Sequence, residues 1–256
     1  GAEDVEARLG VPMLGLLPLA KSKTKSNFAQ ATFLEEGMQS FAEAMRTIRT
    51  GVILSRIDAP HQVVVVTSSV PGEGKTTTSL NLALAMGQME RVLLIDADMR
   101  RPSVAKACNI PAASPGLSNL VAGSADMSQC IHHLEDGNID VLTAGLIPPN
   151  PLELLSSKRF KEVLNQLLEK YDRIVIDSAP TLAVSDALVL ASLANAVIYV
   201  VKSDSTAFHS ARTGIQRLQR VNAPLAGVVL NQVNFSKANK YGSYYGYYDY
   251  YGTKAD

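Results

Sequence analysis

Short apolar runs alternate with amphipathic segments along most of the chain. From residue 63 onward the runs are rich in β-branched residues and contain few polar positions, which is typical of strands buried on both faces of a sheet. The predicted strands are Val63–Thr67, Val92–Ile95, Ile139–Leu142, Ile174–Ile176, Val197–Val201 and Val228–Leu230. The predicted helices between them are Lys75–Gln88, Lys158–Lys170, Ser185–Leu193 and Ala207–Val221. This alternation predicts the α/β class, with a mostly parallel sheet flanked by helices on both faces.

A further amphipathic segment, Leu34–Ser55, precedes the first of these strands. Its apolar residues recur at intervals of three and four, which predicts one stripe of a helix. They are Met38, Phe41, Met45, Ile48 and Val52. Glu43, Arg46 and Arg49 cover an arc of about 120° beside this stripe. From their spacing alone, the three charges form either an edge open to another surface or a solvated face with an i,i+3 ion pair.

The last twenty residues differ in composition from the rest of the chain. They contain seven of its nine tyrosines, interleaved with glycine and serine, and the cluster lacks aliphatic residues that could anchor a core. The tyrosines are Tyr241, Tyr244, Tyr245, Tyr247, Tyr248, Tyr250 and Tyr251. We expect a flexible tail over residues 236–256, and a flexible linker over the polar, basic residues 20–32.

The composition narrows the classes of function. The chain has 256 residues, of which 46% are hydrophobic, so it can form one large core, and its net charge is zero. Balanced charge does not favour nucleic acid as a partner. Cys108 and Cys130 lie in no CxxC or Cys/His pattern, which argues against a zinc, iron–sulfur or disulfide framework. Because no apolar run reaches eighteen residues and no signal peptide is recognisable, we expect a soluble chain in a reducing cytosol.

A glycine-rich loop joins the first predicted strand of the sheet to the helix that follows, which is the context of a P-loop. Its sequence is Ser69-Val-Pro-Gly-Glu-Gly-Lys-Thr76. The glycines let backbone N–H groups face phosphate oxygens, and the helix N-terminus adds its positive dipole end. Lys75 is predicted to reach the β- and γ-phosphates and Thr76 to bind magnesium. The predicted nucleotide contacts are Pro71, Gly72, Glu73, Gly74, Lys75, Thr76 and Thr77.

Acidic residues follow two other predicted strands, at the ends where such a fold binds its ligand. Asp96 and Asp98 are two residues apart, so in an extended chain they point to the same side, where one can lie near magnesium while the other accepts a proton. Asp177 ends the strand Ile174–Ile176 and fits the residue that holds a magnesium-bound water. Arg100 is a weaker candidate for a phosphate contact, and its alternative role is a surface salt bridge.

Together these motifs resemble the bacterial tyrosine kinases known as BY-kinases, which belong to the MinD/ParA branch of P-loop proteins, and most closely the Wzc-like members. The resemblance also includes the Glu43-x-x-Arg46-x-x-Arg49 helix, the tyrosine cluster and the opening segment that ends at Pro18. The residues that carry it are Ser68-Ser-Val-Pro-Gly-Glu-Gly-Lys-Thr76, Leu93-Leu-Ile-Asp-Ala-Asp-Met-Arg-Arg-Pro102, Pro149-Asn-Pro-Leu-Glu-Leu-Leu155 and Ile176-Asp-Ser-Ala-Pro180.

The resemblance implies ATP and magnesium as cofactors and assigns roles to individual residues. Lys75 and Thr76 contact phosphate and magnesium, and Asp98 and Asp177 organise magnesium. The tyrosine hydroxyl is deprotonated by Asp96, a role that the pKa of about 10 of a tyrosine requires of some positioned acceptor. A separate implied contact, from Asn231 to the adenine, has a strand-end turn as its alternative.

The same resemblance implies a wider role. The chain would phosphorylate its own tail in trans within a ring, suggested to be an octamer, that Glu43, Arg46 and Arg49 assemble. It would regulate exopolysaccharide or capsule polymerisation and export, opposed by a tyrosine phosphatase, as the cytoplasmic end of an inner-membrane protein. Residues 1–32 would then be the segment leading from the membrane plus a linker, 33–235 the kinase domain with an assembly helix at 34–55, and 236–256 the tail.

Other functions fit part of the sequence. A MinD- or ParA-type ATPase switch carries a lysine near the start of its P-loop, where this chain has Val70, and MinD-type proteins end in an amphipathic membrane helix instead of tyrosines. An iron–sulfur scaffold ATPase needs a C-terminal CxxC. The third alternative is an ATP-binding assembly module whose Gly/Tyr tail associates through aromatic contacts without any chemistry.

Overall fold

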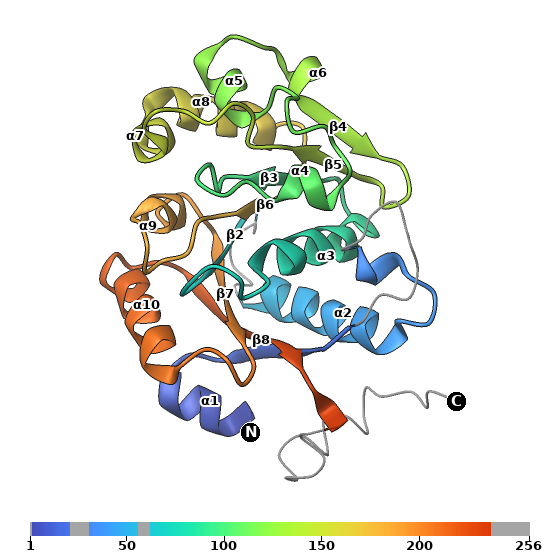
Figure 1. The fold of residues 1–256 in the computed structure, drawn as a ribbon, viewed down its shortest axis with the longest axis vertical. Helices are drawn as coiled ribbons and strands as arrows, with labels where there is room; N and C mark the ends of the chain where they lie inside the picture. The colour runs from blue at the N-terminus through green and yellow to red at the C-terminus, as the bar shows by residue number, and fades with distance from the viewer. Residues whose placement is uncertain (1, 21–30, 56–61, 237–256) are drawn as a thin grey trace.

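The computed structural model describes residues 2–20, 31–55 and 62–236 (Figure 1). One eight-stranded sheet has the order β1-β8-β7-β2-β6-β3-β5-β4, and its pairs are parallel except the antiparallel pair of β4 and β5. The strands are β1 Met13–Pro18, β2 Val63–Ser68, β3 Val92–Asp96, β4 Ile131–Leu134, β5 Ile139–Leu142, β6 Arg173–Asp177, β7 Ala196–Lys202 and β8 Leu225–Val233. The predicted α/β class and mostly parallel sheet are confirmed.

Helices cover both faces of the sheet. Figure 1 shows α2, α3 and α4 on one side and α7 to α10 on the other. The helices are α1 Ala2–Leu9, α2 Gln39–Leu54, α3 Lys75–Gly87, α4 Val104–Ala107, α5 Leu117–Ala122, α6 Met127–Cys130, α7 Pro151–Ser156, α8 Lys158–Leu168, α9 Asp186–Ala191 and α10 Phe208–Arg220, with a short 3-10 turn, η1, at Thr32–Leu34.

The two faces of the central strand β2 enter two separate hydrophobic clusters. Val63 and Val65 pack in the cluster that contains α7 to α10, whereas Val64 and Val66 pack in the cluster that contains α2 and α3. All six residues of β2 are buried. A strand covered on both faces is mostly apolar, which explains the run of four valines that predicts β2.

The start of one helix and both edges of the sheet differ from the sequence-based prediction. The helix predicted from Leu34 begins only at Gln39, because Gly37 adopts a left-handed φ of 83° and separates it from the 3-10 turn. Neither of the two edge strands, β1 and β4, is predicted by the sequence pattern. Of these, β1 pairs in parallel with β8 and therefore makes part of the predicted lead-in segment 1–32 an integral strand of the sheet.

Except for Ser236, the predicted tail lies outside the described residues, as do most of the predicted linker and all seven tail tyrosines. Within residues 2–20, 31–55 and 62–236, the helices are either too short or too polar to cross a membrane.

Strand β6 pairs with β2 on one side and with β3 on the other. Because all three strands are parallel, the P-loop after β2 and the acidic residues after β3 and β6 meet at one edge of the sheet.

Candidate active site

A cavity of about 470 Å³ lies where β2, β3 and β6 end. The P-loop lines one side of it with Pro71, Gly72, Gly74, Lys75, Thr76 and Thr77. The loop after β3 contributes Asp98, Arg100, Arg101 and Ser103, and the segment after β6 contributes residues between 179 and 184. The size and the position at the carboxyl edge of a parallel sheet are those of a small-molecule site.

The glycines of the P-loop have the backbone conformation that the sequence predicts. Gly72 and Gly74 both have a φ of 84°, in the left-handed region where other residues are strained. Gly74 is also crowded, because a Cβ atom there would lie 2.0 Å from Nδ2 of Asn231. Helix α3 begins at the next residue, Lys75, so its free N–H groups face the cavity end of the loop.

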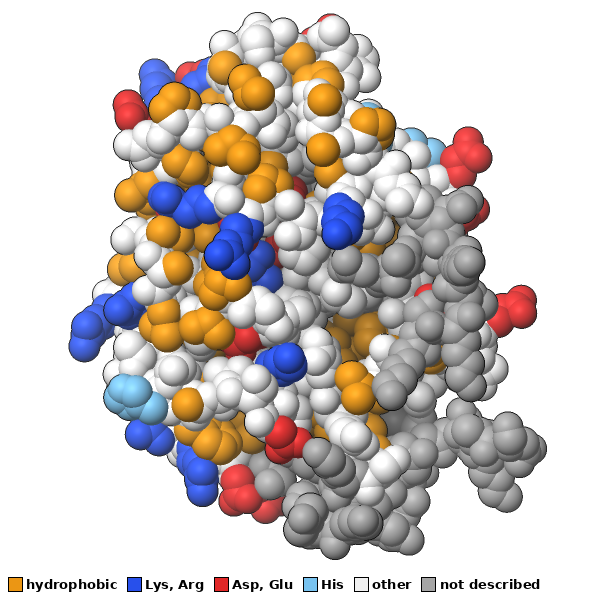
Figure 2. Space-filling view, viewed as in Figure 1, with side chains coloured by type: hydrophobic (Ala, Val, Ile, Leu, Met, Phe, Trp, Pro, Cys, Tyr) orange, Lys and Arg blue, Asp and Glu red, His pale blue; other side chains and the backbone are white. Residues whose placement is uncertain are grey.

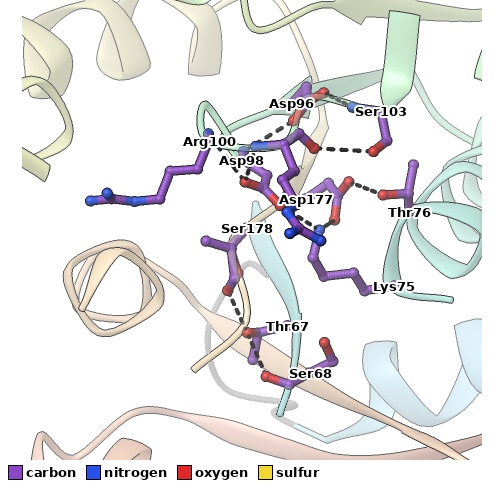
Figure 3. Close-up of polar contacts among 12 residues, drawn as sticks. Thr67, Ser68, Lys75, Thr76, Asp96, Asp98, Arg100, Ser103, Asp177 and Ser178 are labelled. Atoms are coloured by element: carbon purple, nitrogen blue, oxygen red, sulfur yellow. Dashed lines mark hydrogen bonds and ion pairs between the residues drawn. The ribbon is translucent and has the colours of Figure 1, made fainter. Parts of the chain in front are cut away.

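Lys75 lies between two carboxylates. Its Nζ atom is 3.0 Å from Asp98 and 3.2 Å from Asp177, and the hydroxyl of Thr76 donates to the other oxygen of Asp177 at 2.6 Å (Figure 3). Burial lowers the pKa of the Lys75 amine, but the Asp177 and Asp98 carboxylates outweigh burial and hold that pKa above its usual value. For the Asp177 carboxyl, burial raises the pKa and outweighs Lys75 and Thr76, which lower it. The structure therefore brings together the four residues assigned to phosphate and magnesium.

Asp96 has different partners from Asp98. It is fully buried, and its carboxylate accepts hydrogen bonds from the backbone N–H groups of Asp98 at 3.0 Å, Ser103 at 3.0 Å and Val104 at 3.1 Å (Figure 3). Burial, and then the charge of Asp177, raise the pKa of Asp96 to about 7. The side chain thus organises the loop after β3 and does not itself line the cavity. Its role as proton acceptor stays a prediction.

Arg100 forms an ion pair with the first residue of α9, and its side chain points away from Lys75 (Figure 3). Its guanidinium donates to both carboxylate oxygens of Asp186, at 3.0 and 3.1 Å, and Asp186 is fully buried at the start of α9. Of its two sequence-based roles, Arg100 has the salt bridge in this conformation, although its partner is not on the surface. Arg101 is not predicted as a site residue from the sequence, yet it also lines the cavity and is exposed.

Glu73 has a structural role that its place in the loop did not reveal. Its buried carboxylate accepts from the N–H groups of Ser69 and Val70, both at 2.9 Å, from the N–H of Lys202 at 3.2 Å, and from the hydroxyl of Thr206. The side chain of Asn231 donates to the Glu73 carbonyl at 3.1 Å. Residues near the ends of β7 and β8 therefore hold the phosphate loop in shape, and the predicted adenine contact of Asn231 stays a prediction.

Glu73→Gln is expected to raise the dissociation constant of ADP about tenfold, or about 1.4 kcal/mol. The new amide NH₂ cannot accept the hydrogen bonds that one carboxylate oxygen receives, so buried donors of the loop lose their acceptor. Titration calorimetry with ADP measures the change. Glu135→Gln, at an exposed carboxylate, is the matched control. An unchanged ADP affinity in a variant that melts like the parent would contradict the bracing role of Glu73.

The three charges of the predicted assembly edge are divided between two environments. Glu43 and Arg46 form an ion pair on α2, and the Arg46 guanidinium lies 5.2 Å from the ring centroid of Phe33. Arg49 instead donates to the carbonyl of Ala85, in the last turn of α3, and to the Gln88 side chain at 3.4 Å. Arg49 thus connects α2 to the helix that starts at the P-loop.

The sequence is similar to a known domain family and to known tyrosine-protein kinases. The family model described as the AAA domain matches residues 61–227. Tyrosine-protein kinase YwqD of Bacillus subtilis is 38% identical over 202 residues, which are 78% of this chain and 85% of YwqD. Tyrosine-protein kinase etk of Escherichia coli K12 is 32% identical over 195 residues, 76% of this chain. The chain spans 27% of the length of etk, so it corresponds to one part of that longer protein.

Solved structures agree with this result. The crystal structure of the chimerical protein CapA2B2 is 34% identical, superposes with a TM-score of 0.84, and is covered completely by 91% of this chain. The septum site-determining protein MinD of Pyrococcus horikoshii, complexed with Mg-ADP, is 22% identical with a TM-score of 0.55 over 66% of this chain and 70% of MinD. The second likeness concerns the fold alone, and it confirms the predicted MinD/ParA-like architecture.

Proposed function

The chain belongs to the family of bacterial tyrosine-protein kinases, and from this premise we propose that it transfers the γ-phosphoryl group of ATP to tyrosine hydroxyl groups. The observation that carries the proposal is the position of Lys75 between Asp98 and Asp177 at the end of a glycine-rich loop. A buried cation beside two carboxylates and a threonine hydroxyl is a site for a phosphate chain and its metal ion.

The residues present fit ATP with magnesium. Thr76, Asp98 and Asp177 offer hydroxyl and carboxylate oxygens, the ligands that magnesium prefers. Among the described residues, no group of three or more His, Cys, Asp or Glu side chains is placed to hold a metal by itself. Magnesium is usually bound by one or two carboxylates together with substrate phosphates, which agrees with so few protein ligands. When bound, it neutralises charge on the β- and γ-phosphate oxygens.

The residues of the site then have separate roles in the reaction. The P-loop N–H groups hold the phosphates, and Lys75 exchanges its carboxylate partners for β- and γ-phosphate oxygens. A tyrosine hydroxyl with a pKa of about 10 needs a proton acceptor as it attacks. We assign this task to Asp96, which reaches the cavity only when its hydrogen bonds to the loop of residues 98–104 loosen. Catalytic hydrogen bonds are often rearranged in the substrate-free state, so this requirement is compatible with the role.

The proposed acceptors are the seven tyrosines of residues 241–251, which lie outside the described residues. Transfer in trans, from one subunit to the tail of its neighbour in a ring that the resemblance suggests is octameric, would bring many acceptors to each site. Every phosphate adds a charge of about −1.5 to −2, so a phosphorylated ring would repel its own tails and disassemble. This cycle would regulate exopolysaccharide or capsule polymerisation and export, opposed by a tyrosine phosphatase, at the cytoplasmic face of an inner membrane.

Mass mapping of phosphate tests the proposed function. The purified chain is incubated with ATP and magnesium, and its peptides are then analysed for phosphotyrosine. We expect phosphate on tyrosines within residues 241–251. ATP hydrolysis without phosphate on the protein would instead favour the ATPase switch. Self-association that needs the tail but not ATP, with no phosphotyrosine, would favour the assembly module with an aromatic tail.

Replacing Glu43, Arg46 and Arg49 together by alanine is expected to give a variant that assembles into larger particles less than the parent chain does. Light scattering measures the particle mass. Because Arg49 also bonds to the end of α3, Arg49→Ala alone is expected to cost about 1 kcal/mol of unfolding free energy, whereas Arg46→Ala, at an exposed ion pair, costs less. An unchanged mass in a folded triple variant would refute the assembly role.

A further inference from the structure

One wall of the cavity is apolar. Ala179 and Pro180 follow β6, and Ala183 and Val184 precede α9, and all four line the same cavity as Lys75 and Asp98. Ala183 is exposed and Val184 is half-buried, so both are accessible from solvent. Phosphate groups gain nothing from aliphatic side chains, because buried anions need hydrogen-bond donors or cations. Phosphate groups bound by the P-loop and Lys75 therefore do not account for this apolar wall, and another group must contact it.

The wall is fixed in position relative to the phosphate loop. The N–H of Thr181 donates to the carbonyl of Ser68 at 2.8 Å, and the N–H of Leu182 donates to the carbonyl of Ser69 at 3.1 Å. In the opposite direction, the hydroxyl of Thr67 donates to the carbonyl of Ala179 at 3.0 Å. These three hydrogen bonds connect the segment of residues 179–184 directly to the start of the P-loop, so the distance between wall and phosphate end is set by the backbone.

Two arginines hold the same segment from outside. The guanidinium of Arg217, on α10, donates to the carbonyl of Thr181 at 3.0 Å. The ion pair of Arg100 with Asp186 connects the loop after β3 to the first residue of α9, two positions beyond Val184. A segment held at both ends keeps its side chains in one place, which is what a binding surface for a rigid group requires.

We propose that Ala179, Pro180, Ala183 and Val184 form the platform for the aromatic ring of the acceptor tyrosine. The proposal rests on the proposed function and deepens it. A group that lies on an apolar wall and ends in a hydroxyl beside carboxylates must be a flat apolar body with a polar tip, which describes tyrosine. Serine and threonine carry their hydroxyl on Cβ, so neither spans the wall from the mouth of the cavity to the phosphate end.

The platform also explains how the transfer is oriented. With the ring on the wall, the hydroxyl oxygen attacks the γ-phosphorus, a new O–P bond forms, and the bond from the γ-phosphorus to the bridging oxygen of ADP breaks. The hydroxyl proton passes to a carboxylate of the site, and ADP leaves with the bridging oxygen. The platform takes no part in bonding, and its contribution is positioning. Figure 2 shows further hydrophobic side chains, with basic ones beside them, on the face over α7 and α9.

Val184→Ser tests the platform in the chain of 256 residues. The substrate is a synthetic peptide with the sequence of residues 239–251, and phosphate on the peptide is counted by mass separately from phosphate on the chain. We expect the KM for the peptide to rise about tenfold, the scale of one or two methylene groups in an apolar pocket. The dissociation constant of ADP should change less than about twofold. Val184→Ile, which restores apolar area, should keep the parent KM.

Further variants keep the test decisive. Ala183→Glu, at an exposed position, should raise the peptide KM in the same way. Val221→Ser, at an exposed valine just after α10, is the control. An unchanged peptide KM in Val184→Ser would overturn the platform. If Val184→Ser instead loses affinity for ADP while the peptide KM stays the same, the apolar wall contacts the nucleotide, and the platform is also overturned. A parent chain that forms no phosphotyrosine would overturn the proposed function, and the platform with it.

Discussion

Lys75→Met is expected to reduce phosphotyrosine formation by about 100- to 1000-fold or more, because a preorganised charge at the reacting phosphate commonly contributes that much. Methionine matches the length and apolar stem of lysine but has no cation. Lys75 is buried, with Asp98 and Asp177 as its ion-pair partners, so its charge is fixed beside the position proposed for the phosphates. The two carboxylates would then repel the phosphates that the lysine attracts.

The measurement is the rate at which tyrosine phosphate appears in the presence of ATP and magnesium, with thermal unfolding recorded in parallel. Lys106→Met, at an exposed lysine on α4, is the matched control and should retain the parent rate. Removing one partner of a buried ion cluster also affects stability, so the comparison is made below the melting temperature of both variants. Activity within a few-fold of the parent would contradict the role of Lys75.

The same variant tests transfer in trans. A Lys75→Met chain is mixed with a chain that lacks residues 237–256, so that one supplies acceptors and the other a working site. We expect phosphotyrosine to appear on the Lys75→Met chain, and only when the two chains are mixed. If neither the mixture nor the separate chains yield it, while the parent chain does, then each subunit modifies its own tail.

Gly74→Ala is expected to weaken ADP binding more than about 100-fold, whereas Gly72→Ala weakens it only about tenfold. Both glycines have a φ of 84°, and a non-glycine residue there costs about 1–2 kcal/mol, or roughly a factor of ten in affinity if the loop must adopt this shape to bind. Only Gly74 is also crowded, because the added Cβ would meet Asn231 Nδ2 at 2.0 Å, while Gly72 has no atom within 4 Å of that position.

The comparison separates two physical causes with one measurement. Titration of each variant with ADP and magnesium gives the two affinities, and the ratio between them reports the clash alone. Replacing Asn231 by alanine in the Gly74→Ala background removes that clash and should recover part of the loss. Equal affinities of the two single variants would mean that the loop moves away from Asn231 at little cost, and that the contact does not fix its shape.

The sequence predicts the centre of the fold better than its edges. Strand β2 and strand β6 are buried on both faces, so their composition alone identifies them. Strand β1 has the sequence Met-Leu-Gly-Leu-Leu-Pro, whose glycine and proline are poor strand formers, and it forms because β8 offers a free edge. Antiparallel β4 contains two polar histidines and also depends on its neighbour. Strand β1 pairs with a segment more than 200 positions away, and such pairing is not encoded locally. Strand β4 pairs with its neighbour β5 along the chain, but four residues that include two histidines are too short and polar a pattern to predict a strand.

The same division holds for the site. Lys75, Thr76 and Asp177 follow from local motifs, and the structure brings them within hydrogen-bonding distance. The bracing of the loop by Glu73 depends on Thr206, 133 positions away, and no local pattern reveals it. A glutamate between two loop glycines is a weak signal that could have prompted the search for a partner. For Arg100, the choice of Asp186 over phosphate is likewise a property of the folded chain.

The position of β1 has a mechanical consequence. It lies beside β8 in parallel, with hydrogen bonds from the N–H of Val228 to the carbonyl of Pro12 and from the N–H of Leu19 to the carbonyl of Val233. A force applied at Pro12 along the strand direction therefore loads the hydrogen bonds between the two strands together, in shear, and does not unzip them one by one. That load passes to β8, which carries Asn231 against the phosphate loop. Tension at the front of the chain is thus transmitted to the nucleotide site.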